Sequence, residues 1–171
     1  SLNNVTFKGS VTEIGRYAFY NCTSLSKIDI SNVQVINESA FENCNSLIGI
    51  DGNESAGVIA FSDKLRKIKD YAFSGCSKIT QVTIPESATY IGKYAFTNCG
   101  LTKVYFNAGT CEIYGEPEIA HGYISPFVDN PNLTEFEFGK NVATMPGEVC
   151  AKLTSLNNVT FKGSVTEIGR Y

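Results

Sequence analysis

The cysteines are the residues of this chain whose spacing is most regular. Four of them follow an Ala-Phe pair at one fixed offset, as in "YAFYNC", and these are Cys22, Cys44, Cys76 and Cys99. Thiols repeated in this way could form disulfides, bind a metal ion or pack in an apolar interior. Stacked units would bring neighbouring Cα atoms within disulfide range. Zinc needs four ligands that converge on a point, and single sulfurs spread along a line do not converge.

The remaining positions of the same column favour packing. They hold Asn130 and Leu153, and a position that accepts leucine behaves as a small apolar pocket, which also suits a buried thiol. We therefore expect the cysteine column to pack, with disulfides and metal binding as the alternatives. Cys111 and Cys150 lie outside the column.

The single histidine, His121, is the other residue that could do chemistry. Glu116 and Glu118 lie near it in the sequence, and Cys150 could in principle be its nucleophilic partner. Nothing in the spacing fixes the geometry of such a pair. The chain also has no phosphate-binding glycine loop, nucleophile elbow or metal-ligand helix. We expect no catalytic, cofactor-binding or metal-binding site, and no enzymatic activity.

An internal repeat must position all of these side chains. An apolar residue leads each unit, at positions 14, 36, 68, 91, 113, 145 and 168, so the spacing is 22 or 23 residues and twice 32. We predict a single solenoid over residues 1–171 with about six repeats. The two long gaps indicate insertions near 51–64 and 114–125, which we expect to lie on the surface as loops.

Each unit contains a strand and a turn that cannot bury their own apolar face. The strand has the form of "LSKIDI" at Leu25 or "ITQVTI" at Ile79, where apolar residues alternate with polar ones. The Ala-Phe-x-x-Cys segment has the spacing of one or two turns of helix, and Asn or Gly before the Cys suits its end. Units of this size must stack, which places equivalent strands side by side in a parallel sheet.

A longer stretch of sequence occurs at both ends of the chain. The 17 residues "SLNNVTFKGSVTEIGRY" occur at 1–17 and again, without a change, at 155–171. This offset of 154 residues indicates a tandem array in which whole copies follow one another. Artificial joining of the two segments is the alternative.

The segment from Ile68 to Phe106, "IKDYAFSGCSKITQVTIPESATYIGKYAFTNCGLTKVYF", resembles the BspA-like leucine-rich repeat, in which "IGxxAFxxCxxLxxVxIP" recurs. Weaker matches extend over the whole chain, and the units starting at Ile113 and Met145 depart from the pattern. The resemblance implies a right-handed coil with a parallel β-sheet on its concave face, and short strands and short helical turns on the convex side. It also implies a secreted or cell-surface protein that takes part in adhesion.

The polar residues between the apolar strand positions should point away from the core, on the concave face. As a candidate protein-binding set we take Lys27, Asp29, Asp51, Gln81, Thr83, Lys103, Tyr105, Glu135 and Glu137. Tyr105 lies among charges of both signs, which suits a protein contact. The alternative is that these are ordinary solvated positions of a one-sided sheet.

Composition narrows the choice of partners. With 14 basic and 17 acidic residues the chain has a net charge of -3, and no basic stripe is present to bind nucleic acid. No apolar run is long enough to insert into a membrane. We expect a non-enzymatic, adhesin-like module that binds a protein at the cell surface or after secretion, with host and extracellular-matrix proteins as the candidate partners. The alternatives are a structural spacer built from tandem copies and an intracellular scaffold.

Overall fold

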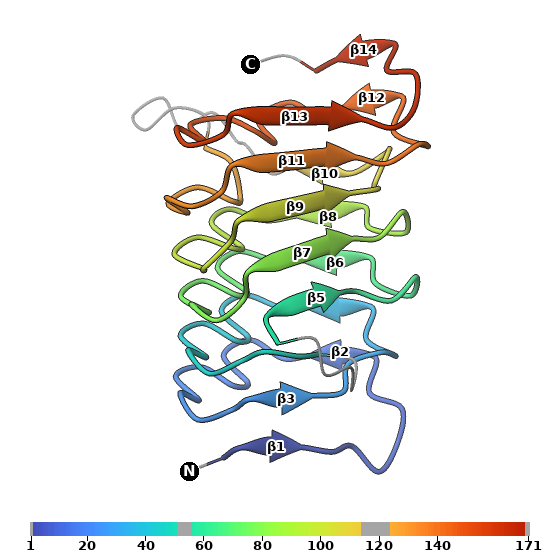
Figure 1. Cartoon of the computed structure of the whole chain (residues 1–171). Coiled ribbons are helices and arrows are strands. Elements are labelled where there is room, and N and C mark those ends of the chain that lie inside the picture. The colour runs from blue at the N-terminus through green and yellow to red at the C-terminus, as the bar shows by residue number, and fades with distance from the viewer. Residues whose placement is uncertain (1, 51–55, 114–123, 170–171) are drawn as a thin grey trace.

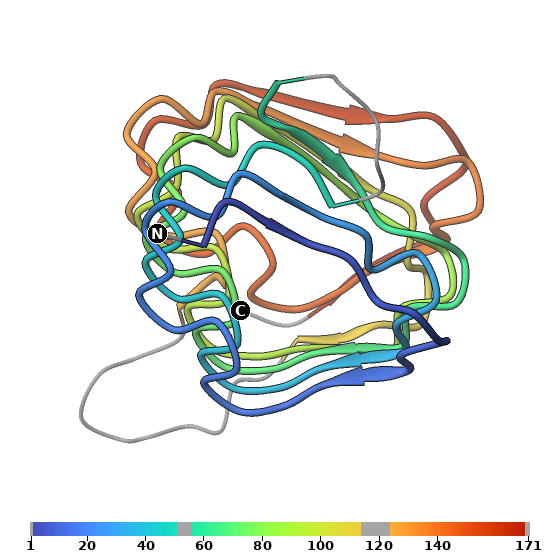
Figure 2. The same ribbon diagram turned by 90° about the horizontal axis from the view of Figure 1, so that it is seen from below.

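The computed structural model describes residues 2–50, 56–113 and 124–169. It is a β-solenoid in which the chain winds in successive coils around one apolar interior (Figures 1 and 2). Each coil passes one strand to a front wall, the side nearest the viewer in Figure 1, and one to a back wall. The front wall contains β1 (Asn4–Val5), β3 (Lys27–Ile28), β5 (Val58–Ala60), β7 (Gln81–Ile84), β9 (Lys103–Phe106), β11 (Glu135–Phe138) and β13 (Asn158–Phe161).

The back wall is built from the shorter strands. These are β2 (Glu13–Ile14), β4 (Val35–Ile36), β6 (Lys67–Ile68), β8 (Tyr90–Ile91), β10 (Glu112–Ile113), β12 (Thr144–Met145) and β14 (Glu167–Ile168). All pairings between neighbouring strands in both walls are parallel and in register, for example Ile36 with Ile68 and Ile68 with Ile91. The leading apolar residue of each repeat is therefore the residue that the back wall turns toward the core.

The interior is filled by equivalent residues of successive coils. Val82 and Val104 are fully buried and are partners in the front wall, whereas Gln81 and Lys103, next to them, point outward. Burial of these apolar side chains is the main favourable term in the folding of such a stack, because no single coil can cover its own face. The predicted alternation of inward and outward residues is confirmed.

A column of phenylalanine rings closes the third side of the coil. Neighbouring rings stack in parallel with centroids 5.1–5.3 Å apart, in the order Phe19, Phe41, Phe73, Phe96 and Phe127. Phe127 belongs to one of the irregular units, and its ring still stacks on that of Phe96. The insertion before it therefore leaves the column intact.

The expected helical turns are not formed: the described residues contain no helix. Instead each Ala-Phe-x-x-Cys segment makes two successive tight turns. Tyr71 and the equivalent Tyr94 have positive φ angles of 56° and 55°, which ends any helical run. The amide of Phe73 donates to the carbonyl of Ala95 in the next coil at 2.8 Å, and that of Phe41 donates to Ala72 at 2.8 Å. Backbone groups that a helix would pair internally thus join neighbouring coils.

The first insertion differs from a simple surface loop. Residues 48–50 continue the front wall next to β3, through the parallel bridge from Lys27 to Gly49. The chain then supplies β5 as an additional strand, because the amide of Gly57 donates to Ile48 at 3.1 Å and the amide of Thr80 donates to Gly57 at 2.7 Å. On the back wall β4 pairs directly with β6. The insertion therefore adds a strand to one wall only. Of the second insertion, residues 114–123 lie outside the described residues.

Candidate protein-binding surface

Two rows of outward-pointing residues run across the front wall. The strand register places Val58, Gln81, Lys103, Glu135 and Asn158 in one row, and Ala60, Thr83, Tyr105, Glu137 and Thr160 in the other. Partners in parallel strands lie about 4.8 Å apart. Residues far apart in the sequence thus form one continuous surface, as predicted for a stack of repeats.

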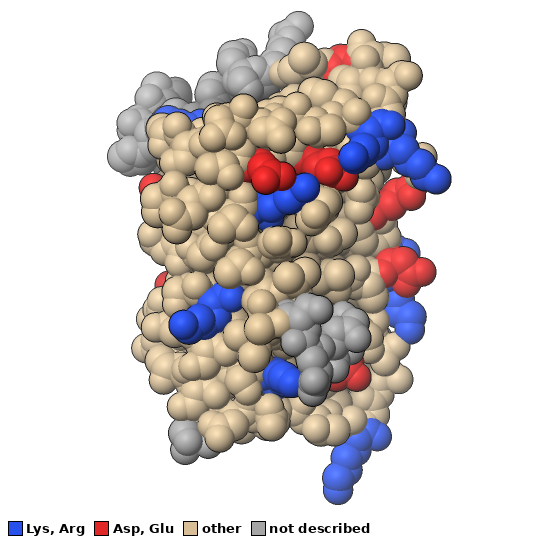
Figure 3. All heavy atoms as spheres, viewed as in Figure 1, with Lys and Arg blue, Asp and Glu red and all other residues tan. Residues whose placement is uncertain are grey.

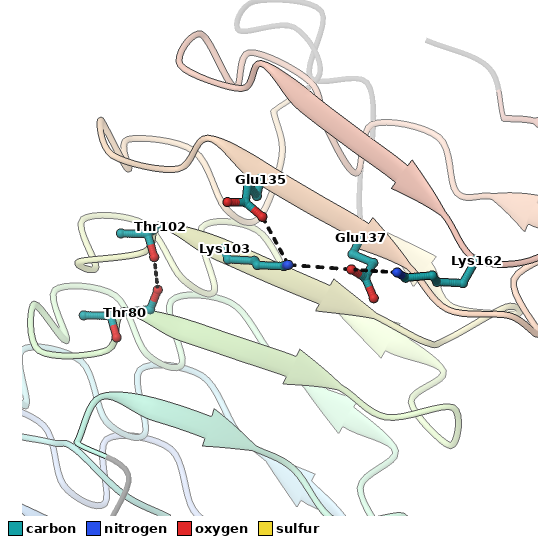
Figure 4. A network of polar contacts seen from close by, with 6 residues as sticks. All are labelled: Thr80, Thr102, Lys103, Glu135, Glu137 and Lys162. Carbon is teal, nitrogen blue, oxygen red and sulfur yellow. Dashed lines mark hydrogen bonds and ion pairs between the residues drawn. The ribbon is translucent and has the colours of Figure 1, made fainter.

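Charges of both signs meet where these rows cross β9, β11 and β13. The Lys103 ammonium lies 3.1 Å from Glu135 Oε2 and 3.6 Å from Glu137 Oε2, and Lys162 Nζ lies 3.7 Å from Glu137 Oε2. Lys103 Nζ also lies 4.6 Å from the centroid of the Tyr105 ring. Figure 4 shows the ion pairs from close by, and Figure 3 shows acidic and basic side chains gathered over these strands. We call Lys103, Tyr105, Glu135, Glu137 and Lys162 the charged network.

The charged network fixes its central lysine and leaves its outer members accessible. The pKa of Lys103 is raised above its ordinary value, first by the interaction with Glu135 and then by that with Tyr105, so the ammonium stays protonated. The side chains of Lys103 and Glu137 are 21% and 22% exposed, whereas those of Glu135 and Lys162 are 48% and 55% exposed. A partner could thus contact the outer charges without first ordering the inner ones.

Only part of the predicted set joins this network. Gln81 and Thr83 precede it on β7, where both are half-buried. Lys27, in β3, lies four strand positions from β9, which is about 19 Å. The Asp29 carboxylate forms a hydrogen bond within its own turn: its Oδ1 accepts the backbone N–H of Ser31 at 2.9 Å. This hydrogen bond lowers the pKa of the carboxyl. Asp51 lies outside the described residues.

Lys162 is the member of the network that the sequence prediction missed. It follows the last residue of β13 and so lies beyond the alternating strand positions, yet its side chain reaches back to Glu137 on the neighbouring strand. The available signal was its position: it comes two residues after Thr160, the register partner of Glu137. Long side chains reach such diagonal neighbours in a sheet.

The cysteines of the column pack as predicted. All six cysteines have free thiols, and Cys44 and Cys76 are fully buried. Each buried thiol of the column donates to a carbonyl one coil back: Cys44 to Phe19 at 3.1 Å, Cys76 to Phe41 at 3.1 Å and Cys99 to Phe73 at 3.2 Å. Burial raises the pKa of Cys44 and of Cys99 to about 12 and raises that of Cys76 well above its usual value. Neutral thiols of this kind are poor nucleophiles and poor metal ligands.

These thiols should be almost inert in the folded protein. At pH 8 a group with a pKa of about 12 is ionised in roughly one molecule in ten thousand. We expect a thiol-specific disulfide reagent to label at most the half-buried Cys22 and Cys150 within minutes, and all six cysteines only after unfolding in denaturant. Rapid labelling of Cys44 or Cys99 under native conditions, located by peptide mass spectrometry, would contradict the buried column.

The other candidate chemistry is not assembled by the described residues. Within 2–50, 56–113 and 124–169, no group of three or more His, Cys, Asp or Glu side chains could hold a metal ion. His121, Glu116 and Glu118 lie outside the described residues, so the pairing of Cys150 with His121 stays untested. An open cleft of about 570 Å³ lies at the turns around Asn98, Asp129 and Lys152, with an apolar part at Val128 and Leu153.

The comparison with known proteins agrees with this architecture. A family model described as the BspA type leucine rich repeat region, in six copies, matches residues 1–60 and 52–171. No curated protein matches the chain at a significant level. No helix among the described residues is long and apolar enough to cross a membrane.

Solved structures of bacterial proteins have the same fold. A leucine-rich repeat protein from T. pallidum is 24% identical, with a TM-score of 0.66, over 93% of this chain and 67% of that chain. A leucine-rich repeat protein from Bacteroides ovatus is also 24% identical, with a TM-score of 0.55, over 98% of this chain. The present chain spans 47% of the length of that second protein. With the family model matched from end to end, the chain belongs to the BspA-type leucine-rich repeat family.

Proposed function

We propose that the protein is a non-enzymatic binding module that recognises another protein through the charged network on its front wall. The observation that carries the proposal is the cluster of two lysines, two glutamates and a tyrosine on β9, β11 and the residue that follows β13. We place the module at the cell surface or outside the cell, where an adhesin-like role fits the BspA-type family.

The geometry of the network suits recognition. A side chain that is already held in place loses less conformational entropy when a partner binds. Lys103 is held by two carboxylates and a ring, and these contacts come from the rigid strands β9 and β11. Tyrosine is frequently a hot-spot residue of protein interfaces. Charged groups at the rim of an interface favour the correct partner over wrong ones.

A spacer is the second candidate, and one observation favours it. The unchanged duplication of 17 residues fits an array whose main property is its length. In that case the exposed ion pairs would serve solubility, and exposed pairs of this kind contribute only about 0–1 kcal/mol each to stability. An intracellular scaffold, in keeping with the free thiols, is the remaining alternative.

A binding experiment separates a recognition surface from a spacer. Immobilised wild-type protein is exposed to a defined panel of purified extracellular-matrix and serum proteins, and dissociation constants are measured for those retained. For the triple variant Tyr105→Ala, Glu135→Ala, Glu137→Ala we expect the affinity to fall at least about 30-fold. This corresponds to the loss of one hot-spot residue that contributes about 2 kcal/mol of binding free energy.

The matched control changes charges on the back wall. Lys67→Ala combined with Glu112→Ala removes two exposed side chains from β6 and β10, and we expect it to bind as the wild type does. Circular dichroism must show that both variants remain folded. Retention of no panel member by the wild type, or equal affinities for all three proteins, would remove the proposal and favour the spacer.

A further inference from the structure

The duplicated segment occurs in two different surroundings in this one structure. We call residues 2–17 the first coil and residues 155–169 the last coil. The first coil carries β3 and β4 on its upper face, whereas the last coil lies on β11 and β12 with its lower face (Figure 1). Identical residues are therefore observed once with the upper neighbour and once with the lower neighbour.

The upper face of the first coil accepts hydrogen bonds from the coil above it. The amide of Ser26 donates to Asn3 O at 2.9 Å, that of Gln34 to Thr12 O at 2.8 Å, and that of Asn37 to Ile14 O at 3.0 Å. The same coil buries Ile14, which is 3% exposed. This face is complementary to the segment 18–50, which forms the next coil and the strand after it.

The lower face of the last coil donates to the coil below it. The amide of Asn157 donates to Thr134 O at 3.2 Å, that of Thr166 to Ala143 O at 2.8 Å, and that of Gly169 to Met145 O at 2.8 Å. The upper face of the last coil is uncovered by any described residue. It exposes Ile168, the twin of Ile14, by 70%, together with Val159 by 42% and Phe161 by 38%.

The glycines of the duplicated segment also have different surroundings in the first coil and in the last coil. A Cβ atom on Gly163 or Gly169 would meet backbone of the coil below, at 2.1 Å from Lys140 O and 2.4 Å from Gly147 N. The twins Gly9 and Gly15 have nothing within 4 Å of that position. Glycine is needed at these sites only where a lower neighbour is present, so the first coil carries residues that fit a coil beneath it.

From this pair of surroundings we infer that a second copy of the 154-residue unit docks on the open face of the last coil and continues the same solenoid. In the joined chain, residues 155–171 serve as the first coil of the following copy. The segment equivalent to 18–50 then covers Ile168 as 18–50 covers Ile14. The occupant is identified by sequence identity, because every contact on the upper face of the first coil can be repeated on the last coil.

The test uses a longer chain in which a copy of residues 18–171 follows Tyr171. The 154 added residues supply six strand positions to the back wall and seven to the front wall. At about 4.8 Å each, they should lengthen the particle by roughly 29 to 34 Å along its axis, measured by small-angle X-ray scattering. Neighbouring copies that share one interior should also unfold in a single thermal transition. Two transitions, or a scattering profile of two bodies joined by a flexible link, would overturn the inference.

One substitution should have a small effect in the 171-residue chain and a large effect in the longer chain. Ile168→Asp changes an exposed residue in the 171-residue protein, and we expect its Tm to move by less than about 2 °C. In the longer chain the same residue would be buried, and we expect Tm to fall by roughly 10 °C or the transition to split. Ile14→Asp in the 171-residue chain is the positive control, since Ile14 is already buried. Equal, small effects of Ile168→Asp in both chains would contradict docking.

A shorter extension keeps the inference testable if the longer chain does not fold. Adding only a copy of residues 18–50 after Tyr171 supplies the proposed upper neighbour. Hydrogen exchange of amides in the added strands should then be slowed at least tenfold relative to the free peptide of residues 18–50. Exchange as fast as in the free peptide would overturn the inference.

Discussion

Replacement of Phe73 by alanine is expected to lower the free energy of unfolding by about 3–5 kcal/mol, the loss typical of a buried phenylalanine. Phe73 is fully buried at the centre of the ring column. Its ring stacks on Phe41 at 5.1 Å and on Phe96 at 5.3 Å, and Phe61 packs against it at 5.5 Å. Neighbouring coils hold these rings in place, so the cavity cannot close easily. Urea denaturation followed by circular dichroism gives the measurement.

Tyr71 provides the matched control for this substitution. It lies two residues earlier in the same turn and stacks on Tyr94 at 5.1 Å, but it is 38% exposed. We expect Tyr71→Ala to cost about 1 kcal/mol, because most of the lost contact is replaced by water. Equal losses for the two variants would mean that the ring column does not hold the coils together.

Asn130 should be the most sensitive buried polar residue. It occupies the column position that cysteine holds in the regular units, and its Nδ2 donates to Phe96 O at 2.8 Å and Phe127 O at 2.9 Å. Its Oδ1 accepts the amide of Leu101 at 3.3 Å. Asn130→Ala leaves these buried backbone groups unpaired, so we expect a loss of about 3 kcal/mol by the same denaturation measurement.

Cysteine at this position should recover part of that loss. In Asn130→Cys the thiol can donate to Phe96 O, as Cys99 donates to Phe73 O at 3.2 Å, and we expect the variant to lose about half as much as Asn130→Ala. Asn132→Ala changes an exposed neighbour and should be neutral within about 0.5 kcal/mol. If the cysteine variant were no more stable than the alanine variant, the side-chain hydrogen bond to the carbonyl one coil back would not explain why this position of the column holds cysteine or asparagine.

Most of the fold follows from the period of the sequence. The leading isoleucines and the alternating strand residues fix which side chains face inward, since a shift by one residue would expose the whole apolar set. For this reason Ile36, Ile68 and Ile91 align across the back wall as predicted. The cysteine column could be interpreted in the same way, because Leu153 at an equivalent position already pointed to an apolar pocket.

Two features of the fold depend on hydrogen bonds between neighbouring coils, which the spacing of residues in the sequence does not reveal. The apolar spacing around Phe73 fits a helix, but the positive φ of Tyr71 and the hydrogen bonds to the next coil select paired turns. Likewise, β5 lies within an apparent insertion and becomes a strand because its edges meet Ile48 on one side and β7 on the other. Four of the five members of the charged network belong to the predicted set, and Lys162 was missed because it enters from a position beyond the strand pattern.

The duplicated coil also has a genetic consequence. If a second copy continues the solenoid as we infer, one stretch of sequence would form both the last coil of one copy and the first coil of the next. Misaligned recombination between the two coding stretches would then insert or delete a whole copy. Every coil of the product would still meet a neighbour that it fits. Natural alleles of this gene should therefore vary in length in steps of 154 codons rather than in single repeats.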